Sequence, residues 1–286
     1  GRILNILERK AREGVEVRVM YDGTCSIFLL PNSYPKKLKA LGIKCKTFAP
    51  LRPLVSTYYN NRDHRKIAII DGHTAFTGGV NLSDEYINKK TLHGHWKDAA
   101  IMLRGEAVKS FTLMFLQMWD VDNRVRDYNT YVNVAHKCRG KAEGYVLPYG
   151  DSPLDSERVG EMVYLDIINN AKRYVHIMLD YEMLQALTFA AKRGVEVCII
   201  LPHIPDKKYA FALAKTHYKD LIAAGVKVYE YLPGFIHSKV FVSDDKRAVV
   251  GTINLDFRSL YLHFECAAYL HEVPVIDDIE KDMQET

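Results

Sequence analysis

Two histidines and two lysines recur in this sequence with the same spacing, and together they could carry out phosphoryl chemistry. The first set is His64 and Lys66, and the second is His237 and Lys239. A neutral imidazole can attack phosphorus, and a protonated one can supply a proton to a leaving alkoxide. Two ammonium groups can hold the oxygens of a phosphodiester. Because residues two apart on a strand face the same side, each lysine should accompany its histidine.

Each pair belongs to a longer motif with the spacing H-x-K-x4-D-x6-G-x-x-N. The residues that complete the two copies are Asp71, Gly78 and Asn81 in the first and Asp244, Gly251 and Asn254 in the second. Every position of the second copy lies 173 residues after its counterpart. At ordinary residue usage, about 10⁻⁴ chance matches are expected in a chain of this size. Two copies therefore indicate a duplicated catalytic motif.

The other motif residues are candidates for supporting roles. Gly78 and Gly79 would let a backbone approach a ligand closely, and the amide of Asn81 could hold phosphoryl oxygens. Their counterparts are Gly251, Thr252 and Asn254.

The motif aspartates, Asp71 and Asp244, are candidate catalytic residues by membership of the motif. Each lies seven residues after its histidine, an odd number, so on a strand the two side chains would face opposite sides. Asp71-Gly72 is also a typical hairpin turn. The preference of aspartate for such turns favours a turn-stabilising role over contact with substrate.

Internal repeats predict an α/β fold of two pseudo-symmetric halves. Residues 10–17 resemble 191–197, and residues 39–45 resemble 222–228, each time as helix, glycine, strand. We expect each half to be a mixed sheet flanked by helices, with the active site at their interface. The proposed halves are residues 1–135 and 136–286, joined by a linker over Asp120–Asp155.

One expected strand breaks the symmetry of the repeat. Tyr174–Met178 alternates as a strand before the first helix of the second half, and the first half has no counterpart. We expect the missing strand to be encoded upstream of residue 1.

Composition narrows the class of protein. The 286 residues carry a net charge of +4, are 48% hydrophobic and 26% charged, and include five scattered cysteines. These values exclude a disordered chain and a disulfide scaffold, and no run of 18 apolar residues occurs. The modest charge suits an anionic substrate or an anionic membrane surface, and it argues against nucleic acid as a partner. No ligand cluster with metal spacing accompanies the motifs, so we predict neither metal nor cofactor.

The duplicated motif resembles that of the phospholipase D superfamily. Further stretches are similar to bacterial cardiolipin synthases, namely Gly94–Asp98, Pro148–Asp155, Pro233–His237 and Asn254–Ser259. The resemblance implies an acidic residue downstream of each motif that orients the histidine of that motif, and Asp98 and Glu265 match these positions. It also implies an enzyme at the cell membrane with its catalytic part on the cytoplasmic side and a membrane-spanning segment upstream of residue 1.

The implied reaction converts two phosphatidylglycerols into cardiolipin and glycerol through a phosphohistidine. The resemblance assigns the nucleophile to His64 and the general acid to His237. A hydrolytic phospholipase D or a phosphatidylserine synthase is the alternative, because the same site chemistry serves another acceptor. A phosphodiesterase-type nuclease is more remote. The sequence leaves the acceptor alcohol and the oligomeric state open.

Overall fold

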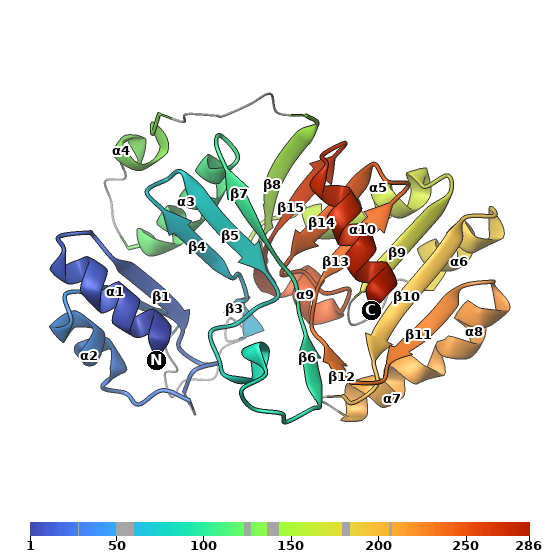
Figure 1. The fold of residues 1–286 in the computed structure, drawn as a ribbon, viewed down its shortest axis with the longest axis horizontal. Helices are drawn as coiled ribbons and strands as arrows, with labels where there is room; N and C mark the ends of the chain where they lie inside the picture. Colours follow the sequence, from blue (N-terminus) through green and yellow to red (C-terminus); the bar gives the residue numbers. More distant parts are fainter. Residues whose placement is uncertain (28, 50–59, 123–126, 136–142, 179–183, 206–207) are drawn as a thin grey trace.

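The computed structural model describes the chain except for residues 28, 50–59, 123–126, 136–142, 179–183 and 206–207. Helices and strands alternate along the chain, and helices lie against mixed sheets (Figure 1). The predicted α/β class is confirmed. Among the described helices the longest have 12 residues, whereas a membrane span needs about 20. No described helix is long and apolar enough to cross a bilayer.

The largest sheet belongs mainly to the second half of the chain. Its strand order is β11-β10-β9-β13-β14-β15-β3, and β8 pairs with β15. Strands β9, β10 and β11 are parallel, and the pairs from β9 through β13 and β14 to β15 are antiparallel. The strands are β3 (Arg62–Asp63), β8 (Tyr145–Asp151), β9 (Tyr174–Met178), β10 (Glu196–Pro202), β11 (Lys227–Tyr231), β13 (Val240–Ser243), β14 (Arg247–Gly251) and β15 (His263–His271).

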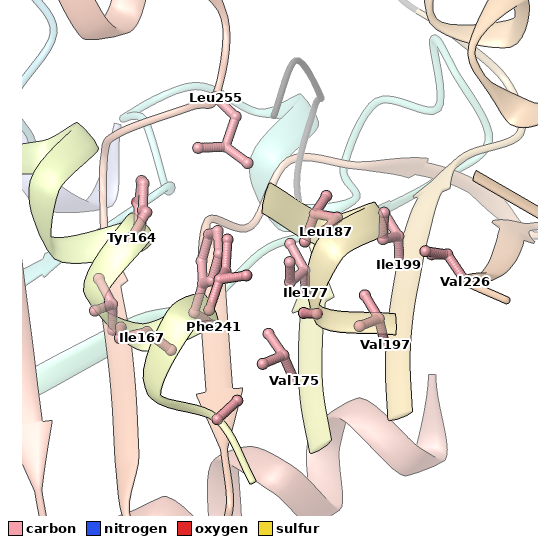
Figure 2. Close-up of a cluster of buried hydrophobic side chains, with 14 of the residues drawn as sticks. Tyr164, Ile167, Val175, Ile177, Leu187, Val197, Ile199, Val226, Phe241 and Leu255 are labelled. Atoms are coloured by element: carbon pink, nitrogen blue, oxygen red, sulfur yellow. The ribbon is translucent and has the colours of Figure 1, made fainter. Parts of the chain in front are cut away.

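One face of this sheet packs under three helices of the second half. They are α5 (Val159–Asn170), α6 (Leu184–Lys192) and α8 (Tyr218–Ala223), while α7 (Lys208–Thr216) lies against α8. Figure 2 shows this core, in which Phe241 of β13 stacks on Tyr164 of α5 with ring centroids 4.1 Å apart. Both rings are fully buried.

The other face of the sheet joins the two halves. Val240 and Val242, which flank Phe241 on β13, point to this second face because side chains alternate along a strand. They share a core with helix α10 (Val275–Glu285) and with Ala75 and Phe111 from the first half. Those two residues come from β5 (Thr74–Gly78) and α3 (Val108–Trp119). The halves are therefore packed through one continuous apolar layer.

The first half contains two smaller sheets. Strands β1 (Arg18–Asp22) and β2 (Lys44–Phe48) are parallel and carry helices α1 (Arg2–Arg12) and α2 (Tyr34–Ala40). Strands β4 (Ile67–Ile70), β5 and β7 (Ala100–Arg104) form an antiparallel sheet. The predicted hairpin after β4 is confirmed.

The two halves repeat the same arrangement with one gap. Strands β1 and β2 correspond to β10 and β11, and β4 and β5 correspond to β13 and β14. In the second half, β9 connects these pairs into one sheet. Among the described residues of the first half no strand takes that place, so the sheets stay separate. This confirms the asymmetry read from the sequence, while the origin of a missing strand stays a prediction.

Two short strand pairs cross from one half to the other. Strand β3 pairs in parallel with the start of β15, and β12 (Gly234–Ile236) pairs in parallel with β6 (His95–Lys97). Of these four strands, β3 and β12 lead directly into the two copies of the motif. A short helix, η2 (Glu85–Ile87), precedes β6, and α9 (Phe257–Tyr261) precedes β15.

The predicted linker over Asp120–Asp155 is wrong for residues 145–151. These residues form β8, which pairs along β15 from Glu265 to His271. The Gly and Pro content that indicates a linker also fits an edge strand. Pro148 has no backbone N–H to donate, and an edge strand tolerates that loss. Helix α4 (Asn129–Val132) occupies another part of the segment. The proposed boundary after residue 135 borders residues 136–142, outside the described residues, and stays a prediction.

The stacked pair of Tyr164 and Phe241 gives a stability test. Phe241→Ala should lower the free energy of unfolding by about 3–5 kcal/mol, because it leaves a cavity in a closed core. Urea unfolding followed by far-ultraviolet circular dichroism measures this change. Phe189 of α6 is 58% exposed, so Phe189→Ala should change it by less than about 0.5 kcal/mol. Equal losses in the two variants would contradict this description of the core.

Candidate active site

The two motif histidines lie between strands rather than within them. His64 and Lys66 separate β3 from β4, and His237 and Lys239 separate β12 from β13. The expectation that each histidine and its lysine lie on a strand is therefore wrong. The strand is interrupted at these residues because β3 and β12 pair with strands of the opposite half, whereas β4 and β13 pair with strands of their own half.

Each lysine folds back onto its own histidine. Lys66 Nζ donates to the carbonyl oxygen of His64 at 2.5 Å, and Lys239 Nζ donates to the carbonyl oxygen of His237. The Lys239 side chain is buried, with 2% of the residue exposed. Each lysine thus accompanies its histidine, as the sequence predicts, and its charge acts on the imidazole.

The orienting acids are exchanged between the two halves. His64 Nδ1 lies 2.9 and 3.0 Å from the carboxylate oxygens of Glu265, and His237 Nδ1 lies 2.9 Å from Asp98 Oδ2. The expectation that each acid orients the histidine of its own motif is therefore wrong. Asp98 and Glu265 both contact a motif histidine, but each contacts the histidine of the other motif.

The crossing strands explain this exchange. The parallel register of β15 and β3 pairs His263 with Arg62 and Phe264 with Asp63, so Glu265 comes opposite His64. The His64 amide also donates to the Phe264 carbonyl at 3.0 Å. The His237 amide donates in the same way to the Lys97 carbonyl, at 2.8 Å. In both places a carboxylate holds Nδ1 and leaves Nε2 for chemistry.

Glu265 is fully buried and is fixed by hydroxyl groups. Ser259 Oγ donates to Glu265 Oε1 at 2.6 Å, and Thr252 Oγ1 donates to Oε2. Burial raises the pKa of Glu265, but His64 and His263 lower it by more than burial raises it. The pKa of Glu265 therefore lies well below its usual range. Thr252 therefore supports the acid. Ser259 is a supporting residue that the sequence analysis did not assign, although it ends a stretch used for the resemblance.

The motif glycines make room for protein atoms. A Cβ at Gly78 would lie 2.3 Å from the Ala99 carbonyl oxygen, and one at Gly251 would lie 2.3 Å from Ala267 Cβ. A Cβ at Gly79 would lie 2.0 Å from Asp98 Oδ1. Close approach of these glycines to a ligand stays a prediction. These positions let neighbouring strands and the orienting acid come close to the motif.

The two motif asparagines differ in their side-chain partners. Asn81 Nδ2 donates to the Tyr86 hydroxyl at 2.7 Å, and the Tyr86 ring stands at right angles to His237 with centroids 5.1 Å apart. The backbone N–H of Asn254 donates to Ser259 Oγ at 2.8 Å, whereas its side-chain Oδ1 is buried and has no hydrogen-bond partner among the described residues. Both asparagines thus belong to the shells around the histidines, and contact with phosphate stays a prediction. Sequence reasoning did not single out Tyr86.

The motif aspartates lie in the hairpin turns. The Asp244 carboxylate accepts backbone N–H groups of Lys172, Arg173 and Tyr174 at 2.8, 2.8 and 3.0 Å. Asp244 and Asp71 have φ angles of 57° and 54° in equivalent turns. Asp244 is the seventh residue after His237, which is about 20 Å along an extended chain. This confirms the turn-stabilising role for Asp244 and corrects its inclusion among catalytic residues. Asp71 occupies the matching turn.

Charges from both halves act on both histidines. Burial lowers the pKa of His64, with Lys66 and Lys239 adding to the effect and Glu265 opposing it. Burial and the charge of Lys239 lower the pKa of His237 to about 3, against the effect of Asp98. Burial also lowers the pKa of Lys66 to about 8, with Lys239 contributing. The two motifs therefore form one electrostatic unit that disfavours the charged form of both imidazoles.

One further histidine lies beside His64. The ring centroids of His263 and His64 are 5.5 Å apart, and His263 Nδ1 lies 3.5 Å from Glu265 Oε1. Ligand atoms of these three residues lie within 4.8 Å of one another, a spacing that could hold a metal ion. Glu265 is already bound to two hydroxyls, and Lys66 adds a positive charge, both of which oppose a cation. The absence of a metal stays a prediction. His263 could have been found from the sequence, because it lies two residues before Glu265 and so faces the same side of a strand.

The fold and site together define a phospholipase D-like protein, with two H-x-K motifs in one centre. The chain belongs to the family described as cardiolipin synthase, PLD-like domain, whose model matches residues 1–119 and 164–286.

Known proteins are similar over almost all of this chain. An uncharacterized protein of Streptococcus mutans is 58% identical over 292 residues, which cover 100% of this chain and 63% of that protein. A cardiolipin synthase of Alkalihalophilus pseudofirmus is 37% identical over 289 residues, which cover 99% of this chain and 57% of that enzyme. The chain thus spans about three fifths of the length of the curated relatives it matches.

A solved structure shares the fold. The crystal structure of phosphatidylserine synthase from Haemophilus influenzae has a TM-score of 0.71 and 14% identity, over 99% of this chain and 76% of that chain. At this identity the likeness supports the arrangement of two phospholipase D-like halves and nothing finer.

The exchanged acids can be tested by nuclear magnetic resonance. Glu265→Gln should change the ring ¹⁵N shifts of His64 and lower its pKa further, because a facing carboxylate favours the imidazolium ion. Asp98→Asn should do the same to His237, which titrates at about 3 in the parent protein. In each variant the other histidine serves as the control. A change at the histidine of the same motif as the substituted acid would contradict the crosswise pairing.

Proposed function

We propose that this chain carries the catalytic centre of a cardiolipin synthase, which transfers a phosphatidyl group between two phosphatidylglycerols and releases glycerol. The observation that carries the proposal is the pair of histidines, each held at Nδ1 by a buried carboxylate and each accompanied by a lysine. Such a centre needs one nucleophile and one proton carrier. The family membership and the curated relatives support this reaction.

In the first step, His64 Nε2 attacks phosphorus. The P–N bond forms, the P–O bond to the leaving glycerol breaks, and His237 gives its proton to the glycerol oxygen. Glu265 stabilises the positive charge that develops on His64 as the bond forms. The lowered pKa of His64 supports this role, because only a neutral imidazole can attack.

In the second step, His237 removes a proton from the hydroxyl of the second phosphatidylglycerol. The hydroxyl oxygen attacks phosphorus, and the P–N bond to His64 breaks. In the free protein, burial and Lys239 keep the pKa of His237 at about 3. The phosphodiester anion of bound substrate offsets the lysine charges and raises that pKa, so His237 carries its proton when substrate is present.

The lysines and asparagines hold the phosphoryl oxygens in this proposal. Lys66 and Lys239 flank the two imidazoles, and their charges face the extra negative charge of an in-line transition state. Asn81 and Asn254 support the same region from both motifs. Exchange of one phosphodiester for another requires no nucleotide and no cofactor.

The substrates also suggest a place in the cell. Phosphatidylglycerol is an anionic lipid, and the chain carries a net charge of +4. We place the catalytic centre at the cytoplasmic face of the cell membrane, with a spanning segment elsewhere in the whole protein. No partner nucleic acid is part of the proposal.

Product analysis tests the reaction. Enzyme incubated with phosphatidylglycerol in mixed micelles should form cardiolipin and glycerol in equal amounts, and EDTA should not stop the reaction. Thin-layer chromatography with mass spectrometry measures both products. Phosphatidic acid as the main product would show that the enzyme hydrolyses phosphatidylglycerol and would contradict the proposed transfer. Full loss in EDTA, restored by one stoichiometric metal, would overturn the mechanism without a metal.

Trapping tests the assignment of the two histidines. A phosphoramidate is stable in base, so an alkaline quench of the reaction with labelled phosphatidylglycerol should retain label on the protein. His64→Asn should not label, because the nucleophile is gone. His237→Asn should label with a donor whose leaving group needs no proton, and the label should persist. The opposite pattern would exchange the two roles.

A further inference from the structure

A buried arginine and a histidine lie two residues along the strands from the exchanged His64–Glu265 pair. Strand β3 pairs Arg62 with His263 of β15. Because side chains alternate along strands, Arg62 lies on the same face as His64, and His263 on the same face as Glu265. The face that carries the candidate nucleophile therefore continues into a second basic pair, about 7 Å along the strands.

Arg62 has more donors than the described residues use. Its side chain is 8% exposed, and Nη1 lies 3.3 Å from Asp22 Oδ1. Its Nε and Nη2 atoms are buried and have no hydrogen-bond partner within the described part of the chain. Buried donors without a partner are unfavourable, and native proteins satisfy most of them. This guanidinium is therefore short of an acceptor.

Asp22 cannot supply that acceptor. Its carboxylate also accepts the backbone N–H groups of Thr24 and Cys25 at 2.9 Å each and that of Asp63 at 3.2 Å. These three donors fix Asp22 at the end of β1, and they leave Arg62 with a single ion pair. The Nε and Nη2 atoms of a guanidinium form a fork that matches two oxygens of one anion.

His263, which lies beside Arg62, also lacks hydrogen-bond partners among the described residues. Both of its ring nitrogens are buried and make no hydrogen bond among the described residues. The nearest acceptor is Glu265 Oε1, 3.5 Å from Nδ1, and that carboxylate is already bound to His64 and Ser259. Arg62 and His263 thus present several unused donors on the face that continues from the candidate nucleophile.

We propose that Arg62 and His263 form a subsite for the phosphate of the acceptor molecule. The inference rests on the proposed function and names the part of the site that selects the acceptor. In cardiolipin, one glycerol unit separates the two phosphates. That separation matches the step of about 7 Å between the Arg62–His263 pair and the His64–Glu265 pair. An acceptor whose phosphate sits in the subsite places its free hydroxyl at phosphorus on His64.

The subsite acts on the second step of the reaction. The acceptor hydroxyl loses its proton to His237, its oxygen bonds to phosphorus, and the P–N bond to His64 breaks. Arg62 and His263 take no part in these bond changes. They hold the distal phosphate, so an acceptor with a phosphate is favoured over one without it, and over water.

Two soluble acceptors that differ by one phosphate test the subsite. With labelled phosphatidylglycerol as donor, the wild-type enzyme should prefer sn-glycerol 3-phosphate over glycerol in kcat/KM. In Arg62→Lys, which keeps a charge for Asp22 but loses the fork, the ratio of the two kcat/KM values should fall about tenfold. His263→Asn should lower the same ratio. Transfer to phosphatidylglycerol should fall with transfer to glycerol phosphate.

Arg65→Lys is the matched control. Arg65 is a largely buried neighbour in which each guanidinium nitrogen already donates to Asp63 or to the Met114 carbonyl, so its replacement should leave the ratio unchanged. Thermal unfolding checks that all three variants fold. Equal losses for both acceptors in His263→Asn would make His263 a positioning residue for Glu265 and would overturn the subsite.

The same assay separates the two proposals. A wild-type enzyme that prefers glycerol phosphate but forms no cardiolipin supports the subsite and overturns the proposed function. A wild-type enzyme that forms cardiolipin without preferring glycerol phosphate, or variants with an unchanged ratio, overturn the subsite and leave the proposed function standing.

Discussion

The rest of the structure depends on the exchange of carboxylates between two histidines. Glu265 of the second half holds His64, and Asp98 of the first half holds His237. Neither half alone supplies the carboxylate that holds its own motif histidine. The short parallel pairs β3–β15 and β12–β6 exist at the two points where this exchange occurs, and the apolar layer between the halves keeps them in register. The pairing therefore links catalysis to the packing of the two halves.

The exchange is symmetric in topology and asymmetric in chemistry. Gly79 and Thr252 are counterparts in the repeat, yet Gly79 leaves room for Asp98, whereas Thr252 donates to Glu265. Glu265 receives a second hydroxyl from Ser259, while Asp98 accepts the backbone N–H of Ala99 at 2.8 Å. A carboxylate with more donors is held more firmly as an anion. This difference gives the two motifs distinct environments on a duplicated scaffold, in line with distinct roles for their histidines.

Much of the architecture was open to prediction from local patterns. The repeated helix, glycine and strand segments predict two α/β halves, and the turn preference of Asp244 correctly predicts its turn role. The motif spacing selects the residues of the site. The acid pairing escaped prediction because it depends on strands that meet across 201 residues of sequence, which no local pattern records. The glycine roles escaped for the same reason, since Gly78 makes space for Ala99 of another segment. Arg62 and His263 stand out only once β3 and β15 are seen to pair.

A crystal structure with vanadate tests the shared centre most directly. Vanadate adopts the five-coordinate geometry of phosphoryl transfer, so it reports which side chains surround a phosphorus in line. The account predicts vanadium bonded to His64 Nε2, with His237 Nε2 facing it from the opposite side and Lys66 and Lys239 on its oxygens. Glu265 and Asp98 should stay on Nδ1 of His64 and His237, respectively. Vanadate held by one motif alone, with the other histidine turned away or paired with the acid of its own half, would contradict it.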